Sequence, residues 1–175
     1  MNAAIRVLTP STRDQIAQHL LQLSAADRRL HFGAPFTDAA IRGYAVTLNF
    51  SRDQLFGVFE AGALVGLAHL AVRPDGASAQ LGISVAPARR CRGYAYALLR
   101  ASVQHARRIA CRRLDMHHLA ESRVMVHLAR KAGLSVIGWT GETGPHLALG
   151  VEADEAASPA RHSPRRRGLR SLLPR

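Results

Sequence analysis

Apolar residues recur with a changing period along this chain, and each change of period predicts a new secondary-structure element. The run from Ile5 to Leu8 is typical of a short strand, and Thr9-Pro10-Ser11 supplies turn residues and a helix N-cap. Residues 27–30 are typical of a short turn or helical link, and a second helix is expected to begin at Thr37 or Asp38. The first helix is predicted from the helical spacing of Ile16, Leu20, Leu21 and Leu23.

The middle of the chain changes to patterns that favour strands. Residues 55–60 and 64–72 form β-type runs joined by Ala61-Gly62, which fits a hairpin turn. Arg73-Pro74-Asp75-Gly76 is a second turn signal, and residues 79–85 form a third β-type run. These patterns predict three successive strands.

Helical and β-type patterns alternate after the third of these strands. Residues 93–108 and 122–132 have helical periodicity, and residues 113–119 between them form a β-type run. Residues 134–139 and 145–151 predict two closing strands. The helix at residues 122–132 is expected to bury Val124, Met125, Leu128 and Ala132.

The resulting order is β-α-α-β-β-β-α-β-α-β-β. It predicts an α/β fold (α+β mixed sheet), in which one sheet contains parallel and antiparallel strands and helices cover its faces. Residues 79–119 are expected to form a right-handed crossover between parallel strands. We expect one domain over residues 1–151. Residues 152–175 have no period and contain three prolines, which predicts a basic, disordered tail.

The composition is that of a globular protein, with 47% hydrophobic and 21% charged residues. A net charge of +12 favours anionic partners, and both a nucleotide cofactor and a nucleic acid fit that description. The two cysteines, Cys91 and Cys111, imply no disulfide framework and favour a reducing compartment. Because the sequence has neither a signal-peptide pattern nor an apolar run of about 18 residues, we expect a cytoplasmic protein without a membrane span.

The segment from Val85 to Leu99 carries the most specific chemistry. It reads Val-Ala-Pro-Ala-Arg-Arg-Cys-Arg-Gly-Tyr-Ala-Tyr-Ala-Leu-Leu, so a β-type run enters an arginine-rich loop that opens into a helix. Amide N–H groups at the start of a helix lack intrahelical partners, and the helix dipole adds partial positive charge there. Because Arg89, Arg90 and Arg92 add fixed cations, the loop is expected to bind a phosphorylated ligand.

This loop and the order of elements resemble the GNAT superfamily of N-acetyltransferases. The cofactor motif of that family, Gln/Arg-x-x-Gly-x-Gly/Ala, is matched here by Arg90-Cys91-Arg92-Gly93-Tyr94-Ala95. The family also places Val-x-Pro before the motif and Leu-Leu after it, matched by Val85-Ala86-Pro87 and Leu98-Leu99. The resemblance covers roughly residues 5–150 and is specific, because the motif lies between the expected strand and the expected helix.

The resemblance implies that acetyl-CoA is the co-substrate. Its pyrophosphate would contact the backbone amides of Arg90 to Ala95, where Gly93 has no Cβ to obstruct a close approach. Its thioester would lie where the strands at 79–85 and 113–119 splay apart, and an acceptor amine would attack it directly in a ternary complex. The Val85 amide would then stabilise the oxyanion. The cofactor-binding residues that the resemblance implies are Ile83, Val85, Arg90, Cys91, Arg92, Gly93, Tyr94, Ala95 and Ser122.

A second family pattern, Asn-x-x-Ala-x-x-Leu-Tyr-x-x-x-Gly-Phe, is matched only in part by residues 122–134. The leucine and the glycine agree, but Ser122 replaces the asparagine. Ala129 replaces a tyrosine that commonly protonates the departing CoA thiolate. The arrangement is closest to the protein-acetyltransferase-like branch, whose members often carry Ala-Glu where this chain has Ala79-Gln80. Gln80 cannot replace a glutamate that acts as a general base.

No residue stands out as the general base. His69 and His118 are the candidates, because a histidine near the splay can relay a proton at neutral pH, and the alternative is that each is packed for structural reasons. In the expected strand at 113–119, His117 and His118 point to opposite faces. Since no set of residues has metal-ligand spacing, we expect no metal site. Cys91, where the family usually has glycine, is either a reactive thiol or a small tolerated side chain.

Three hypotheses for the function follow. The leading one is an N-acetyltransferase that transfers an acetyl group from acetyl-CoA to a protein lysine or a small-molecule amine. The second is a CoA- or acyl-CoA-binding module with weak or no transferase activity, because Gln80, Ser122 and Ala129 all depart from common functional types. The third is a nucleic-acid-binding protein that uses the basic tail, although Arg165-Arg166-Arg167 has no aromatic neighbour for base stacking. The sequence leaves the acceptor open, and also whether the protein is a monomer or a homodimer.

Overall fold

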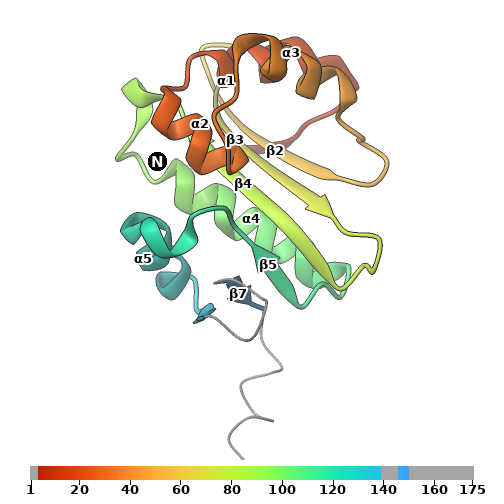
Figure 1. The fold of residues 1–175 in the computed structure, drawn as a ribbon, viewed down its shortest axis with the longest axis vertical. Coiled ribbons are helices and arrows are strands. Elements are labelled where there is room, and N and C mark those ends of the chain that lie inside the picture. The colour runs from red at the N-terminus through yellow and green to blue at the C-terminus, as the bar shows by residue number, and fades with distance from the viewer. Residues whose placement is uncertain (1–3, 139–145, 150–175) are drawn as a thin grey trace, which may run out of the picture.

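A computed structural model of the chain describes residues 4–138 and 146–149. These residues form one mixed sheet of seven strands in the order β1-β2-β3-β4-β5-β7-β6, with helices packed on it (Figure 1). The expected tail, residues 152–175, lies outside the described residues. The strands are β1 (Ile5–Val7), β2 (Gln54–Glu60), β3 (Ala63–Val72), β4 (Ser78–Val85), β5 (Arg113–Asp115), β6 (Ser135–Ile137) and β7 (His146–Ala148). The helices are α1 (Arg13–Leu21), α2 (Ala25–Phe32), α3 (Asp38–Thr47), α4 (Tyr94–Arg108) and α5 (Arg123–Lys131).

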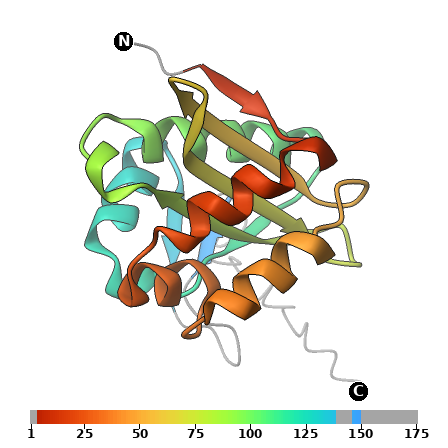
Figure 2. The same cartoon turned by 90° about the horizontal axis from the view of Figure 1, so that it is seen from above.

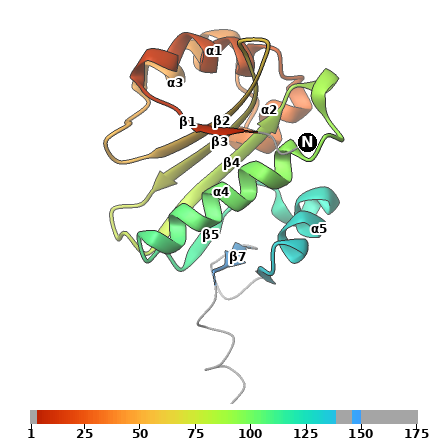
Figure 3. The ribbon, with the colours of Figure 1, turned by 180° about the vertical axis from the view of Figure 1, so that it is seen from behind.

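Helices cover both faces of the sheet, as the order of elements predicted. Figure 2 shows α1, α2 and α3 on one face, and Figure 3 shows α4 crossing the other. One core cluster joins α1 and α3 to β2 and β3 through Ile16, Ile41 and Leu67. The other joins α4 to β3 and β4 through Leu98 and Leu81. Strand β3 therefore contributes to both cores, with Leu67 in the first and Leu70 in the second.

The segment expected to be a turn or helical link is a full helix, α2, which corrects the predicted order by one helix. Its sequence has little apolar periodicity, and His31 is its one buried residue. The caps explain the helix. The Ser24 hydroxyl accepts a hydrogen bond from the Asp27 amide at 3.1 Å, and Gly33 ends the helix at φ 81°.

The parallel pairing of β4 with β5 is confirmed, and it is short. The two strands are in register only from Ser78 opposite Arg113 to Gln80 opposite Asp115. β4 continues to Val85, whereas β5 ends at Asp115. The expectation that the second strand reaches residue 119 and carries His117 and His118 on opposite faces is therefore wrong. His118 instead takes a left-handed conformation, φ 51°, and precedes a short 3-10 turn.

Helix α5 buries a different stripe from the predicted one. Met125, Leu128 and Ala132 pack against the core as expected, but Val124 is 66% exposed and Ala129 is fully buried. The correction follows from helical geometry, because positions 125, 128, 129 and 132 share one face and position 124 lies off it.

Candidate functional site

The widening gap between β4 and β5 leaves one edge of β4 without a strand partner. The Ala86 amide donates to the Val65 carbonyl of β3 at 2.8 Å, so it points away from the gap. Successive amides along a strand point in opposite directions. The amides of Val85 and Ile83 therefore face the gap, where they can bind the backbone-like amides of a ligand.

The loop after β4 turns sharply before it enters α4. Cys91 and Gly93 both lie in the left-handed region, with φ values of 60° and 79°. This conformation is easy for glycine and costs other residues about 1–2 kcal/mol, which gives a physical reason for the glycine that the family usually has where Cys91 stands. Gly93 is the N-cap of α4, and no described side chain caps the helix there. The first amides of α4 are thus free to bind an anion.

The gap and the loop open into one pocket of about 420 Å³. It contains every residue predicted to bind the cofactor except Arg92. Helices α2 and α5 supply the opposite walls, including Val124, Met125 and Leu128, which the sequence analysis expected in the core rather than in the site. Its lining comprises Leu23, Asp27, Leu30, Ile83, Ser84, Val85, Arg89, Arg90, Cys91, Gly93, Tyr94, Ala95, Tyr96, Ser122, Val124, Met125 and Leu128.

Two carboxylates from distant parts of the chain hold the arginines of the loop. Glu60 at the end of β2 lies 2.6 Å from Arg89 Nε and 3.4 Å from Arg92 Nη1, and it accepts a hydrogen bond from the Tyr94 hydroxyl. That hydrogen bond, followed by the arginine charges, lowers the pKa of Glu60. The arginines of this loop are thus oriented by Glu60 rather than disordered in solvent.

Asp27 makes a corresponding contact from the other side of the loop. Its Oδ2 lies 2.7 Å from Arg90 Nη2, which ties α2 to the loop. Burial opposes ionisation of this carboxyl, but the Ser24 hydroxyl and Arg90 outweigh it and lower its pKa. Arg90 is therefore held at the wall of the pocket, whereas Arg92 is directed toward Glu60 and away from it.

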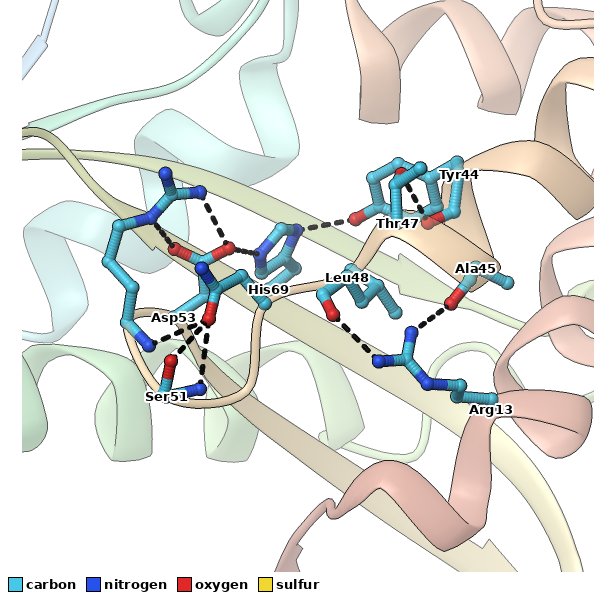
Figure 4. Close-up of polar contacts among 10 residues, drawn as sticks. Arg13, Tyr44, Ala45, Thr47, Leu48, Ser51, Asp53 and His69 are labelled. Atoms are coloured by element: carbon cyan, nitrogen blue, oxygen red, sulfur yellow. Dashed lines mark hydrogen bonds and ion pairs between the residues drawn. The ribbon is translucent and has the colours of Figure 1, made fainter.

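His69 belongs to a buried chain of polar groups on the face covered by α1–α3 (Figure 4). Its Nε2 lies 3.2 Å from Asp53 Oδ2, and its Nδ1 contacts the Tyr44 hydroxyl. Since Nε2 faces a carboxylate, it carries the proton of the neutral ring, and Nδ1 accepts from Tyr44. Burial lowers the pKa of His69, and Asp53 opposes that shift. Arg52 makes a two-point ion pair with the outer side of Asp53.

Two further histidines are buried beside β4. His31 covers Gly82, where an added Cβ would lie 3.1 Å from the imidazole ring. His19 Nε2 lies 2.9 Å from the Ser84 hydroxyl. Burial lowers the pKa of His31 to about 3 and that of His19 to about 4, so both rings are neutral at physiological pH.

The other predicted histidine, His118, has surface partners. Its Nδ1 lies 2.9 Å from Glu121 Oε1, and its Nε2 lies 3.4 Å from the Gly33 carbonyl. These contacts connect the end of β5 to the end of α2. Of the two predicted histidines, only His69 is therefore backed by a buried carboxylate.

The comparison with known protein families decides what kind of fold carries this pocket. The sequence model described as the Acetyltransferase (GNAT) family matches residues 15–134, which is more than half of the chain. The chain belongs to the acetyltransferase (GNAT) family. The predicted fold and the family resemblance are both confirmed.

Individual members of the GNAT family agree with this assignment. Over 97 residues the chain is 41% identical to a mycothiol acetyltransferase of Thermomonospora curvata, a match that covers 55% of this chain and 31% of that relative. The GNAT domain of S. lividans PAT has the same fold, with a TM-score of 0.67 at 18% identity over 83% of this chain and 89% of that one. The second structure is a spermidine N-acetyltransferase from Vibrio cholerae in complex with CoA and spermine. Its TM-score is 0.60 at 18% identity, and the match covers 83% of this chain and 91% of that one.

The described part of this GNAT chain contains neither a membrane-spanning helix nor a cluster of metal-ligating side chains. None of the helices within residues 4–138 and 146–149 is long and apolar enough to span a membrane. The same residues contain no group of three or more His, Cys, Asp or Glu side chains arranged to hold a metal ion.

Four residues that shape the site were missed by the sequence analysis, namely Asp27, Tyr44, Asp53 and Glu60. Each contacts a predicted site residue from a part of the chain at least 16 positions away. One signal was available in principle, because carboxylates are the side chains that orient arginines in a loop. The sequence does not say which carboxylates lie nearby.

Proposed function

We propose that this chain transfers an acetyl group from acetyl-CoA to the nitrogen of an amine. The family match supports the reaction class, and the pocket that joins the arginine loop to the β4–β5 gap carries the proposal for this chain. Such a pocket can hold an elongated molecule with anionic groups at one end and a reactive thioester at the other.

The loop is the proposed binding site for the cofactor's pyrophosphate. Amides at the start of α4, from Gly93 to Ala95, can donate to its oxygens, and Arg89 and Arg90 supply positive charge at the pocket wall. The rest of the cofactor would extend along the free edge of β4, with Ile83 and Val85 amides as partners. Ser122 lines the same pocket from the start of α5, where its hydroxyl also accepts a hydrogen bond from the Met125 amide.

The proposed chemical step is direct attack of the amine on the acetyl carbonyl. A C–N bond forms, the C–S bond breaks, and the leaving thiolate takes up one proton. The Val85 amide faces the gap and can stabilise the negative charge that develops on the carbonyl oxygen. Ala129 is fully buried in α5 and has no proton to give, so water supplies the proton for the thiolate.

The amine must lose a proton before it can attack. We assign this proton to His69, through the Tyr44 hydroxyl. Burial and the Asp53 charge raise the pKa of Tyr44, so the phenol stays protonated. The Tyr44 hydroxyl can accept a proton from the amine while it donates its own proton to His69 Nδ1. Asp53 then stabilises the imidazolium. His118, whose partner Glu121 is exposed, is the less suitable candidate.

The acceptor is proposed to be a small-molecule amine rather than a protein lysine. The mycothiol acetyltransferase relative supports this choice by its name, although the chain spans only 31% of that relative. A reducing, cytoplasmic setting is consistent with two free thiols, Cys91 on the surface and Cys111 in the core.

Acetyl-CoA binding and turnover test the proposal separately. Thermal unfolding is measured with acetyl-CoA and with CoA, and thiol release is then followed with a panel of amines. We expect stabilisation by both nucleotides and amine-dependent release of CoA. Stabilisation without release from any amine would support the alternative of a CoA-binding module. If neither nucleotide stabilises the chain, both ideas fail.

A further inference from the structure

The pocket beside the loop is lined from both faces of the sheet. The Ala86 amide points to β3, and amides two residues apart along a strand point the same way, so the backbone of Ser84 also faces β3. Ser84 therefore lines the pocket through its side chain. Its partner across the strands is Leu67, which lies in the core under α1 and α3, and directly opposite residues share a face. The Ser84 hydroxyl thus belongs to the α1–α3 side of the pocket.

Helix α2 runs along this side of the pocket. Near its start Asp27 contacts Arg90 of the loop, and near its end His31 covers Gly82 of β4. Leu30, which is next to His31 in the chain, lines the pocket and is 44% exposed. Leu30 is thus farther from the proposed phosphate site than Asp27 is, and it borders the part of the pocket nearer the thioester.

The Ser84 hydroxyl has hydrogen-bonding capacity left for a ligand. Its Oγ lies 2.9 Å from His19 Nε2, and the structure gives it no second partner among the described residues. A hydroxyl has one donor and two acceptor sites, so at least one lone pair remains whichever way the bond to His19 is oriented. This lone pair can accept an N–H of a bound amine. Because Ser84 directly precedes Val85, the proposed oxyanion donor, an amine bound there lies beside the acetyl carbonyl.

The other surroundings on this side of the pocket are mostly apolar. Leu23 and Leu30 line it, together with Asp27. The Asp27 carboxylate already has the Ser24 hydroxyl at 2.6 Å and the Arg90 guanidinium at 2.7 Å. Among the described lining residues Asp27 is the only acidic one, so a second ammonium group would find no free carboxylate. Additional hydroxyl groups would lose their water and gain no partner beside the two leucines.

We propose that the acceptor is a small monoamine with an apolar carbon skeleton, which enters from the α1–α3 side of the pocket. Ser84 binds its nitrogen, and Leu23 and Leu30 pack against its skeleton. This inference rests on the proposed function, because it names the class of the second substrate of the same site. It sets aside polyamines and amino sugars, whose further ammonium or hydroxyl groups have no partner on this side.

A panel of four amines tests the substrate class. CoA release is measured with 2-phenylethylamine, ethanolamine, glucosamine and spermidine under identical conditions. Ethanolamine keeps the nitrogen but lacks the apolar body, whereas glucosamine and spermidine add hydroxyl and ammonium groups. We expect kcat/KM for 2-phenylethylamine to be at least about tenfold above that for each of the other three. A kcat/KM for any of these three that equals or exceeds that for 2-phenylethylamine would overturn the inference.

Ser84→Ala tests the bond to the amine. It removes the hydroxyl, so we expect KM for 2-phenylethylamine to rise about three- to tenfold while the acetyl-CoA Kd stays unchanged. Ser102→Ala is the matched control, because it removes a buried hydroxyl of α4 that bonds to the Leu98 carbonyl and does not line the pocket. The control should leave both constants unaltered. An unchanged KM in Ser84→Ala would contradict the assignment.

Leu30→Asn tests the apolar wall with a readout that a purely structural role would not move. It places a polar amide where the carbon skeleton would pack. The ratio of kcat/KM for 2-phenylethylamine to that for ethanolamine should therefore fall at least about fivefold. Val46→Asn alters an exposed apolar residue of α3 outside the pocket and should leave this ratio as it is. A constant ratio in Leu30→Asn, or a weaker acetyl-CoA Kd in its place, would count against the proposal.

Binding of acetyl-CoA by the wild-type chain separates this inference from the proposed function. If acetyl-CoA does not stabilise the chain against thermal unfolding, the proposed function fails. If acetyl-CoA stabilises the chain but a polar amine is the best acceptor, or none of the four amines releases CoA, only this inference fails.

Discussion

Asp53 Oδ2 lies 3.2 Å from His69 Nε2, although Asp53 precedes β2 and His69 lies near the end of β3. The antiparallel register of these strands brings the two residues together, and α3 closes the pair with Tyr44. The side chain of Asp53 is only 3% exposed, so its charge acts on the imidazole with little screening by water. The pair therefore influences the protonation of the histidine that is proposed to accept the proton of the amine.

Replacing Asp53 tests its role in proton transfer. Asp53→Asn removes the charge that stabilises the imidazolium, so we expect kcat to fall at least about tenfold. Asp53 raises the pKa of His69, and activity is lost as pH falls through that pKa because a protonated ring cannot accept a proton. The acid limb of the pH profile should therefore move to lower pH.

Arg52→Gln is the matched control, because Arg52 lowers the pKa of His69. Its acid limb should move to higher pH, opposite to that of Asp53→Asn. Steady-state kinetics between about pH 5 and 9 measure both shifts. Shifts in the same direction, or none, would show that His69 is not the group that titrates.

Gly93→Ala separates backbone strain from obstruction of the pocket. A Cβ at Gly93 meets no described protein atom within 4 Å, but it would project at the pocket wall. We expect the acetyl-CoA Kd to rise at least about tenfold. The left-handed backbone should also cost about 1–2 kcal/mol of stability.

Gly76→Ala provides the comparison for that strain. Gly76 has φ 65°, also has no neighbour within 4 Å, and does not line the pocket. Its stability loss should match that of Gly93→Ala while acetyl-CoA binding is unchanged. Calorimetric titration and chemical unfolding of both variants measure the two effects. If Gly93→Ala and Gly76→Ala have equal Kd values for acetyl-CoA, the phosphates of the cofactor do not bind at Gly93.

The arginines of the loop should contribute unequally to binding. Arg90 lines the pocket, whereas Arg92 points to Glu60. We expect Arg90→Ala to raise the acetyl-CoA Kd about tenfold, because it removes a charged donor and leaves Asp27 unpaired near the phosphates. Arg92→Ala should raise it less than about threefold. Binding assays at one fixed salt concentration make the comparison, and the reverse order would contradict the assigned geometry.

Acid should destabilise the protein through its buried histidines. The pKa of His19 is about 4 in the folded chain, below its ordinary value near 6.5, so the unfolded chain binds more protons between these values. Stability is therefore complete above about pH 6.5 and falls as pH decreases. At pH 5 the loss from His19 is about 2 kcal/mol.

His19→Gln removes this titration and keeps a group that can bond to Ser84. Its free energy of unfolding should change between pH 7 and 5 by about 2 kcal/mol less than that of wild type. His127→Gln alters an exposed histidine of α5 and should leave the pH dependence as it is. Urea unfolding at both pH values provides the measurement. The prediction fails if His19→Gln and wild type lose stability equally.

The cofactor loop could be predicted from the sequence, because its conformation depends on residues that are neighbours in the chain. The turn at Cys91 to Gly93, the start of α4 and the backbone edge of β4 all lie within one continuous segment. Its residue types determine both the conformation and the chemistry. That is why almost all of the predicted cofactor-binding residues meet in one pocket.

Contacts between distant segments set the rest. Helix α2 forms because its caps and its packing on β4 outweigh a weak apolar pattern. The end of β5 at Asp115 depends on where α2 and the following turn meet, which a β-type pattern cannot report. Pairs such as Glu60 with Tyr94 depend on the sheet register, which becomes known only when the fold is known.

Gly82 has a consequence for how this family member can evolve. Because His31 packs over it, with the nearest ring atoms 3.1 Å and the backbone oxygen 3.2 Å from where a Cβ would stand, a side chain at position 82 requires His31 to shift by a few tenths of an ångström. A side chain at position 82 is therefore accommodated most easily when the residue at position 31 changes with it. Related chains that carry a side chain at position 82 should have lost the imidazole at position 31, so these two columns should covary in an alignment.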